Sequence, residues 1–338
     1  MRGLELARAY YEECGKPWIH REFPEFEGRI AVGLAGEGSE CFGFDDEISR
    51  DHDFEPGFCV WIPEEDETAV GFKLMRGYKK LPDTFMGVTR RAVSLFGGGR
   101  RGVHGIAEFY GGFTGCPGAP EDPFQWLRLP EHSLACAVNG QVFRDDLGEF
   151  SRIRNEIGKG YPRDARLKKL AARAATMAQS GQYNFSRCAA RGEYGAAALA
   201  LSEFVTASVS MFHLLCGRYA PYYKWGIRSL REMEDQVMEQ AGVRFSRAGI
   251  PMPDGRASRP RLGAGLASAL EELLTEPTNA GTAAGKAAAV ERIAAAAIDG
   301  LRAQGLTGGS WDYLEPHAME IMERIGDPMI RNMHVMEG

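Results

Sequence analysis

One short stretch constrains this chain more than any other, Gly33 to Asp53, which reads GLAGEGSECFGFDDEISRDHD. It combines a glycine turn, a serine directly behind that turn, and two aspartates separated by a single residue. Just before the turn, Ile30, Val32 and Leu34 alternate with small residues, which predicts a short buried strand. A strand, a glycine turn and paired carboxylates in this order are the parts of a site that binds a nucleotide together with magnesium.

The glycine turn has the chemistry of a phosphate site. Gly36 and Gly38 allow the backbone to turn tightly, and we expect a short helix to begin at about Ser39. The free N–H groups at the start of such a helix, together with the Ser39 hydroxyl, suit phosphate oxygens. Gly38 and Ser39 are therefore candidates for phosphate binding.

The two aspartates are candidate catalytic residues and metal ligands. Asp51 and Asp53 precede an apolar strand at residues 58–62, and we expect them to continue that strand. Residues i and i+2 of a strand share one face and lie about 6.6 Å apart. Carboxylates at that spacing can share hard cations in the geometry that supports displacement at phosphorus. The alternative, that the acidic run DDEISRDHDFE forms a solvated loop, stays open.

These residues carry a resemblance. Gly38-Ser39 followed by Asp51-His52-Asp53 resembles the signature of the polymerase-beta-like nucleotidyltransferase superfamily, which includes aminoglycoside nucleotidyltransferases and minimal nucleotidyltransferases. Over most of its length the chain is similar to an uncharacterised family of bacterial nucleotidyltransferase-like proteins. The matching pieces are GEGSECFGFDDEISRDHDF, WLRLPEHSLACAVNGQVFRDDLGEFSRIR and RYAPYYKW.

The resemblance implies that a nucleoside monophosphate is transferred from a triphosphate, with ATP the expected donor, to a hydroxyl of an acceptor. It places the triphosphate on Ser39 and the neighbouring amides, and two Mg²⁺ ions on Asp51 and Asp53. The acceptor, a small molecule or a protein, is not identified by the resemblance. Two other functions stay open: a nucleotide-binding, antitoxin-like or regulatory partner with weak or lost catalysis, and a kinase on the same scaffold.

In that superfamily a third carboxylate, on a later strand, activates the acceptor. Residues 103–109 read as the next strand, and Glu108 on it is the candidate for this role. Asp145 and Asp146 compete with it. Their alternative role is to cap the helix that begins at about Leu147.

Several basic residues are candidates for binding phosphate. Arg50 and Lys224 could neutralise the charge that develops on the leaving pyrophosphate. Lys224 belongs to an aromatic run at residues 218–225, which could stack a base or could be a packed helix start. Four further arginines flank a triple glycine and form either a phosphate-binding loop or an ordinary surface loop: Arg90, Arg91, Arg100 and Arg101.

The secondary structure that the sequence predicts changes near residues 158–162, from mixed strands and turns to nearly continuous helix. We therefore predict an α+β fold, with a nucleotidyltransferase domain built on a mixed sheet at residues 1–158 and an α-helical bundle at 159–338 that binds substrate or partner. The first domain includes an apparent hairpin, SLACAVNGQVFRDD, at residues 133–146. We expect the active site between the two domains.

Composition and apolar patterning restrict the class of protein and its expected cellular location. The formal net charge of −6 argues against a general nucleic-acid binder. Seven scattered cysteines without a C-x-x-C pair predict thiols in a reducing cytoplasm. The N-terminus lacks the apolar stretch of a signal peptide, and the longest apolar run, residues 196–216, is interrupted by polar side chains. We expect a cytoplasmic protein without a membrane span.

Overall fold

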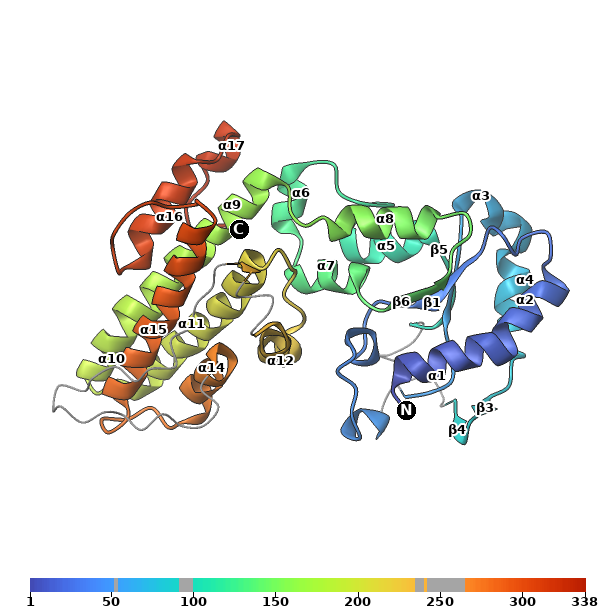
Figure 1. Ribbon diagram of the computed structural model, residues 1–338, viewed down its shortest axis with the longest axis horizontal. Helices are drawn as coiled ribbons and strands as arrows, with labels where there is room; N and C mark the ends of the chain where they lie inside the picture. The colour runs from blue at the N-terminus through green and yellow to red at the C-terminus, as the bar shows by residue number, and fades with distance from the viewer. Residues whose placement is uncertain (52–53, 91–99, 235–239, 242–264) are drawn as a thin grey trace. The chain divides into compact units, whose positions relative to one another are not determined.

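The computed structural model describes residues 1–51, 54–90, 100–234, 240–241 and 265–338 (Figure 1). The chain divides into two compact units, one made of residues 1–121 and 133–159 and the other of residues 122–132 and 160–338. The sequence had suggested a division after residue 158. It had not suggested that residues 122–132 pack with the second unit.

The first unit combines helices with short strands. Its elements are α1 (Gly3–Tyr10), the π-helical η1 (Tyr11–Gly15), α2 (Lys16–Glu22), β1 (Ala31–Leu34), the 3₁₀ turns η2 (Glu40–Phe42) and η3 (Ile48–Asp51), β2 (Cys59–Ile62), α3 (Glu64–Asp66), the π-helical η4 (Glu67–Gly71), α4 (Phe72–Tyr78), β3 (Thr84–Phe85), β4 (Val88–Thr89), β5 (Gly102–Gly105), α5 (Ile106–Thr114), α7 (Glu131–Val138), β6 (Gln141–Arg144) and α8 (Glu149–Gly158).

Four of these strands form one sheet in the order β5-β2-β1-β6. β1 runs antiparallel to both β2 and β6, whereas β5 runs parallel to β2. The predicted mixed sheet is therefore confirmed. β3 and β4 form a separate two-stranded hairpin.

Both faces of the sheet are covered, which explains why β1 and β2 are buried along their whole length. Val32, Val60 and Ile62 belong to a core shared with side chains of α1, α2 and α4. On the opposite face, Trp61 stacks on Phe150 of α8 with ring centroids 3.8 Å apart. Figure 1 shows α5 and α8 on one side of β1 and β6, and α1 on the other. Because successive strand residues point to opposite faces, alternating side chains enter two different cores.

The strand predicted at residues 103–109 is wrong for its second half. β5 ends at Gly105 and α5 begins at Ile106. The Gly105 N–H donates a hydrogen bond to Glu108 Oε2 at 3.3 Å, so this carboxylate satisfies an amide at the start of the helix. A glutamate three residues into a helix is a capping residue, and this role competes with strand formation.

The predicted hairpin at residues 133–146 is also wrong for its first arm. Residues 131–138 form α7, and only residues 141–144 form a strand. The sequence EHSLACAV contains one β-branched residue, and its leucine and alanines favour a helix. The Asn139-Gly140 pair ends that helix, with Gly140 at φ +70°, instead of turning a hairpin.

In its described residues, the regular structure of the second unit is helical, as predicted for the C-terminal region. Its elements are α6 (Pro123–Arg128), α9 (Arg163–Met177), the π-helical η5 (Ala178–Phe185), α10 (Ser186–Ala190), α11 (Tyr194–Leu215), α12 (Tyr223–Met233), α14 (Leu266–Thr275), α15 (Ala283–Ala303), α16 (Leu314–Glu323) and α17 (Pro328–Arg331). α9, η5 and α10 follow one another without a break, and α11 packs against α9 and η5.

α11 is the helix, among the described residues, that is long and apolar enough to cross a membrane by length and composition. Of its most apolar window, 56% is buried inside the protein. Phe204 and Phe212 are fully buried, whereas Leu199 is exposed. This distribution is that of a core helix in a helical unit.

Candidate functional site

Three strands bring the candidate site together at one edge of the sheet. Gly33 at the end of β1 lies opposite Cys59 at the start of β2, because these strands are antiparallel. Cys59 also lies opposite Gly102 at the start of β5. The glycine turn leaves this edge after β1, and two arginines precede β5. In the sequence, the two aspartates come before β2. We call this end of the sheet the turn edge.

The glycine turn adopts a backbone that requires glycine. Gly36 and Gly38 have φ of +107° and +124°, in the left-handed region that side chains disfavour. Ser39 then precedes η2, which is a single 3₁₀ turn of three residues. A short helical turn thus begins at Ser39 as expected, and because it spans three residues its dipole contributes little.

The amides of this turn are open. Within the described part of the chain, the N–H groups of Glu37, Gly38 and Ser39 donate no hydrogen bond, and neither does the Ser39 hydroxyl. Glu37 is exposed, and the other two residues are half-buried. Successive N–H groups without an acceptor form a concave site that binds anions. The turn therefore retains the chemistry expected of a phosphate site.

Asn139 fixes the position of the turn. Its Nδ2 donates to the carbonyl oxygen of Gly36, and its Oδ1 accepts from the Gly36 N–H, each at 2.8 Å. The next residue, Gly140, donates its N–H to the carbonyl of Cys41 at 2.8 Å. Sequence reasoning missed Asn139, because the Asn-Gly pair indicated a hairpin turn and nothing in the local pattern pointed to Gly36.

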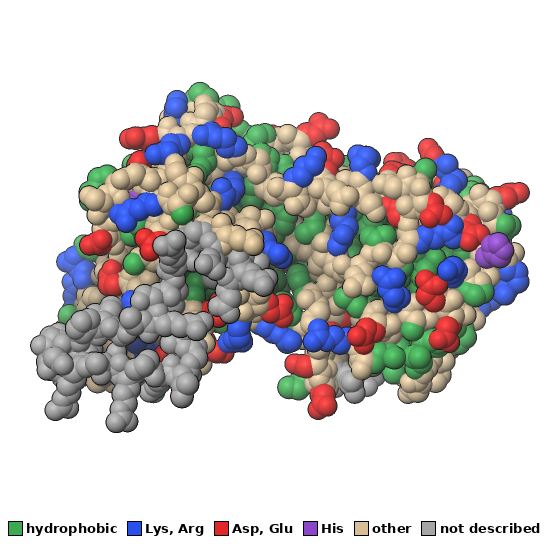
Figure 2. Space-filling view, in the orientation of Figure 1, with side chains coloured by type: hydrophobic (Ala, Val, Ile, Leu, Met, Phe, Trp, Pro, Cys, Tyr) green, Lys and Arg blue, Asp and Glu red, His purple; other side chains and the backbone are tan. Residues whose placement is uncertain are grey.

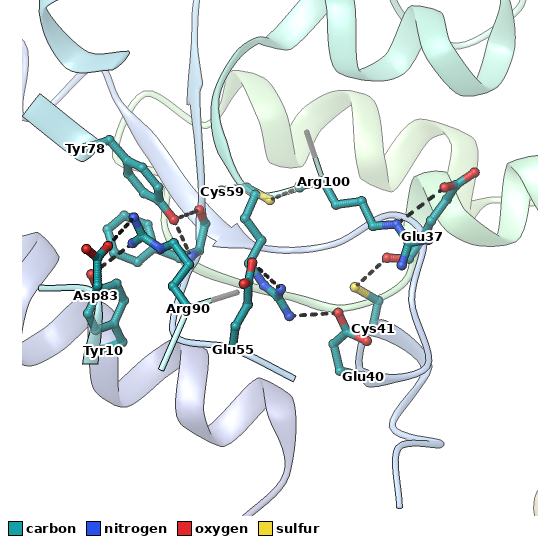
Figure 3. Close-up of polar contacts among 12 residues, drawn as sticks. Tyr10, Glu37, Glu40, Cys41, Glu55, Cys59, Tyr78, Asp83, Arg90 and Arg100 are labelled. Atoms are coloured by element: carbon teal, nitrogen blue, oxygen red, sulfur yellow. Dashed lines mark hydrogen bonds and ion pairs between the residues drawn. The ribbon is translucent and has the colours of Figure 1, made fainter. Parts of the chain in front are cut away.

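Arg101 organises the carboxylates of the turn edge, two of which, Glu40 and Glu55, are labelled in Figure 3. Its guanidinium donates to Glu40 Oε1 at 3.0 Å and to Glu55 Oε1 at 3.2 Å. The Arg101 side chain is 10% exposed and that of Glu40 is 7% exposed. Burial lowers the pKa of Arg101, but the Glu40 and Glu55 carboxylates outweigh that effect and raise it. Arg101 therefore carries a permanent positive charge between two acids.

The other described arginines of the predicted phosphate loop also have partners. Arg100 Nε lies 3.7 Å from Glu37 Oε2, which brings a second arginine to the glycine turn. Arg90 donates to the Tyr10 hydroxyl at 3.1 Å and lies 3.5 Å from Asp83. Arg91 and the triple glycine lie outside the described residues. Arg100 and Arg101 thus belong to the turn edge, whereas Arg90 stabilises packing.

The two cysteines at this edge are not nucleophiles. Cys59 Sγ donates to the Arg100 carbonyl at 3.2 Å, and burial raises its pKa to about 12. Cys41 Sγ donates to the Glu37 carbonyl at 3.6 Å, and burial raises its pKa well above the ordinary value. Since the thiolate is the reactive form, neither group supports covalent catalysis at neutral pH.

The aspartates of the sequence motif are only partly described. Asp51 ends η3, so the prediction that it lies on a strand is wrong for this residue. Asp53 lies outside the described residues, as do the side chains of Arg50 and Asp51. Among the residues that the structure describes, no group of three or more His, Cys, Asp or Glu side chains could hold a metal ion. The predicted Mg²⁺ site therefore depends on Asp51 and Asp53.

The extra acidic residues before this motif have local partners. Asp45 Oδ2 accepts the N–H of Gly3 at 2.7 Å and so holds the start of α1. Asp46 Oδ1 accepts from the N–H and the hydroxyl of Ser49 at 3.0 and 3.1 Å, at the start of η3. These bonds account for Asp45 and Asp46 of the acidic run, and Glu47 is exposed.

Glu108 lies away from the turn edge. β5 starts at that edge with Gly102 and ends with Gly105, opposite Ile62. Glu108 follows this far end, so the length of the strand, about 10 Å, separates it from the glycine turn. The structure therefore does not bring Glu108 together with Gly38 and Ser39.

Asp145 and Asp146, the competing candidates, have structural partners. Asp145 accepts from the N–H of Gly148 at 3.0 Å and from the N–H of Ser151 at 2.7 Å, at the start of α8. Asp146 accepts from the Arg144 guanidinium, with Nε at 2.9 Å. Asp145 thus caps α8, which was the alternative role considered for it.

Lys224 belongs to the second unit, at the start of α12. Its Nζ lies 5.4 Å from the centroid of the Trp225 ring, and the side chain is exposed. In the same aromatic run, Tyr219 is buried against Tyr161 with ring centroids 5.0 Å apart, whereas Tyr223 is 81% exposed. The aromatic run is therefore packed against the protein at Tyr219 and exposed to solvent at Tyr223.

On the face drawn in Figure 2, acidic and basic side chains are interspersed over both units instead of gathering into one extended basic patch. The same mixture occurs at the turn edge, where Glu37, Glu40 and Glu55 lie with Arg100 and Arg101. Among the described residues of this edge, these three acids against two arginines leave one net negative charge. An anionic ligand would need cations to bind there.

Comparison with known protein families finds a match over residues 126–226, to the family described as "Domain of unknown function (DUF4037)". The match runs from α6 to the start of α12 and covers less than half of the chain. It includes Asn139 but not the glycine turn. Comparisons with curated proteins and with solved structures find no match. This chain is thus similar, over residues 126–226, to a family whose function is unknown.

Proposed function

We propose that the first unit binds a nucleoside triphosphate with Mg²⁺ at the turn edge and transfers its nucleoside monophosphate to a hydroxyl of an acceptor, with ATP the expected donor. One observation carries the proposal. The open amides of Glu37, Gly38 and Ser39 follow β1 at the sheet edge where β2 begins, and the D-x-D motif precedes β2 in the sequence. A phosphate site and a pair of carboxylates are what this reaction requires.

The chain's own residues have separate roles in this proposal. Gly38 and Ser39 hold the phosphates through N–H groups and a hydroxyl. Asp51 and Asp53 would hold two Mg²⁺ ions, which when bound neutralise phosphate charge and orient the triphosphate. Arg50 and Lys224 remain candidates for contacting the leaving pyrophosphate. Three glutamates against two arginines among the described residues of this edge favour a triphosphate only when divalent cations accompany it.

The reaction balances without a redox step. The acceptor hydroxyl oxygen forms a bond to the α-phosphorus, and the bond from that phosphorus to the bridging α–β oxygen breaks. Pyrophosphate leaves with the electron pair of that bond. The hydroxyl proton passes to a base, a role for which Glu108 is misplaced because it follows the far end of β5.

The test is calorimetric titration of ATP, GTP, CTP and UTP into the full chain, with and without Mg²⁺. We expect Mg²⁺-dependent binding of one triphosphate, abolished by the double variant Asp51→Asn/Asp53→Asn. Glu47→Gln is the matched control, because Glu47 is an exposed acid of the same segment. Equal binding by the double variant and the control would refute the assignment. Product analysis then distinguishes this reaction, which releases pyrophosphate, from a kinase, which yields the diphosphate.

Arg101 favours a second candidate function, a nucleotide-binding regulatory or antitoxin-like protein with weak or lost catalysis. Its buried guanidinium already pairs with Glu40 and Glu55, so these two carboxylates are held by an arginine instead of being available to assist a metal. Binding of a triphosphate without any turnover, together with co-purification of a partner protein, would support this alternative. The seven cysteines, all free thiols in the structure, fit the reducing cytoplasm proposed for either function.

A further inference from the structure

The second unit contains a buried lysine that differs from its buried neighbours. Lys168, Lys169 and Lys286 are each at most 3% exposed. Acceptors satisfy the ammonium groups of two of them: the carbonyls of His334 and Val335 for Lys168, and the carbonyls of Leu273 and Glu276 with Thr278 Oγ1 for Lys286. These two lysines hold chain segments together, which is an ordinary structural role.

Lys169 of α9 has no such acceptor. Within the described residues it makes no hydrogen bond or ion pair, and its Nζ lies 5.1 Å from the centroid of the Tyr161 ring. Burial lowers the pKa of Lys169 to about 8, although the Glu131 carboxylate acts to raise it. Burying an ammonium without acceptors is costly. The fold keeps Lys169 buried despite this cost in free energy, which indicates a use for its amine other than packing.

In the described part of the chain, two further buried polar atoms near Lys169 also lack a hydrogen-bond partner, the Tyr161 hydroxyl and Glu131 Oε2. Glu131 Oε1, in contrast, accepts from the Ser210 hydroxyl at 2.5 Å and lies 3.6 Å from Arg173 Nη2. The charges of Glu131 and Arg173 act on both the Lys169 amine and the Tyr161 hydroxyl, so these four groups are neighbours. They come from α7, the loop before α9, and α9 itself.

The neighbouring rings keep Tyr161 in place. Its ring packs edge-on against Trp126 at 5.9 Å and against Tyr219 at 5.0 Å between centroids. Arg173 is held as well, since its Nε donates to Ser210 Oγ at 2.8 Å and its Nη2 to the Gly338 main-chain oxygen at 2.9 Å. Such fixed donors cost little to order when a ligand binds.

We propose that Lys169, Tyr161, Arg173 and Glu131 form a binding site for a small ligand that carries an oxyanion, either carboxylate or phosphate, next to a hydroxyl or amine. Lys169 and Arg173 against Glu131 leave one net positive charge, which selects an anion. The Tyr161 hydroxyl and the Lys169 amine donate to its oxygens, and Glu131 Oε2 accepts from the ligand's own donor. All four residues lie within residues 126–226, where the family match occurs.

The site is tested with the full chain, without nucleotide, by calorimetric titration of two probes, inorganic phosphate and glycolate. We expect at least one probe to bind, and Lys169→Met and Tyr161→Phe to weaken it by about tenfold or more. Lys168→Met is the matched control, because Lys168 is the adjacent buried lysine with its acceptors already filled. Binding of glycolate but not phosphate identifies a carboxylate ligand, and the reverse identifies a phosphate ligand.

Thermal unfolding without a probe separates a ligand site from a packing role. The proposal predicts that Lys169→Met unfolds at the same temperature as the wild type or higher, since the substitution removes a buried ammonium without acceptors. If Lys169→Met does not fold, Tyr161→Phe decides, because it keeps the ring packing. Failure of both probes to bind the wild type, or equal binding by Tyr161→Phe and wild type, overturns the proposal. Neither result depends on the turn edge.

Discussion

Asn139 and Gly36 hold each other through two hydrogen bonds of 2.8 Å across 103 residues of sequence. The side-chain amide of Asn139 pairs with both main-chain groups of Gly36, as a neighbouring strand would. The glycine turn is therefore fixed from outside its own segment. Its open amides are held in place before any ligand arrives, which is what a preorganised phosphate site requires.

Replacing Asn139 should weaken both stability and binding. Asn139→Ala removes two hydrogen bonds, and we expect the free energy of unfolding to fall by about 1–3 kcal/mol. If the turn binds phosphate, triphosphate affinity should also fall by about tenfold. Asn139→Asp keeps an acceptor for the Gly36 N–H but places a second oxygen against the Gly36 carbonyl, so it should be no better than alanine. Denaturant unfolding and calorimetry measure the two effects, and wild-type values in both variants would contradict this role.

The buried charges of Arg101 and Glu40 should be strongly coupled. Arg101→Met leaves Glu40, whose side chain is 7% exposed, without its guanidinium partner. Removing one member of such a pair typically costs about 3–5 kcal/mol. The double variant Arg101→Met/Glu40→Gln should lose less than the sum of the two single variants. Urea unfolding of the four proteins gives the coupling energy, and strict additivity would show that the pair does not interact.

Substituting Glu108 tests whether this residue, which follows the far end of β5, takes part in nucleotide binding. As a residue that satisfies the Gly105 N–H, it should contribute about 0.5–2 kcal/mol to stability and nothing to nucleotide binding. Glu108→Ala should therefore lower the unfolding midpoint and leave the calorimetric affinity for triphosphate unchanged. A large loss of affinity at unchanged stability would restore Glu108 as a residue of the nucleotide site.

Lowering the pH should destabilise the second unit, because the Glu320 carboxylate becomes protonated. Its carboxylate accepts from the Thr307 hydroxyl, from the Gly308 N–H at 2.9 Å and from Arg324 at 3.0 Å, and these bonds lower its pKa to about 2. A carboxyl whose pKa is depressed by folding stabilises the protein fully above its unfolded pKa of about 4.5. That stabilisation is lost as the pH falls toward about 2.

The comparison that isolates Glu320 uses Glu320→Gln and the exposed neighbour Glu323→Gln. Between pH 5 and pH 2 the unfolding temperature of the wild type should fall more than that of Glu320→Gln, so the two curves converge at low pH. Glu323→Gln should follow the wild type. Parallel curves for wild type and Glu320→Gln would show that this carboxylate has no special stabilisation.

The parts of the fold that sequence could predict are those whose signals are local. Ile30 to Leu34 and Phe58 to Ile62 read as buried strands, and β1 and β2 occupy these positions. Helical spacing also predicted the C-terminal helices. The predicted hairpin was wrong because an Asn-Gly pair serves equally well to end a helix. Only the contact with Gly36 shows whether the pair forms a hairpin turn or ends a helix.

The candidate site could be predicted only where its residues are close in sequence. Gly38 and Ser39 became candidates because glycine, serine and a preceding strand form a local pattern. Asn139 and Arg101 were not assigned their roles, since their partners lie far away along the chain. Lys169 is still harder to identify from sequence, because the sequence around it is that of an ordinary amphipathic helix. What distinguishes it is the absence of acceptors among its described neighbours.

The division of the chain has a consequence for how this protein can be taken apart or recombined. The backbone passes from one unit to the other three times, near residues 121, 132 and 159. A fragment cut after residue 158 would carry Trp126 and Glu131 away from Tyr161 and Ser210, with which they pack and bond. A single crossover between genes would likewise leave each product with part of the wrong core. No single cut therefore separates the two units, and a clean separation would require joining residue 121 to residue 133 and residue 132 to residue 160.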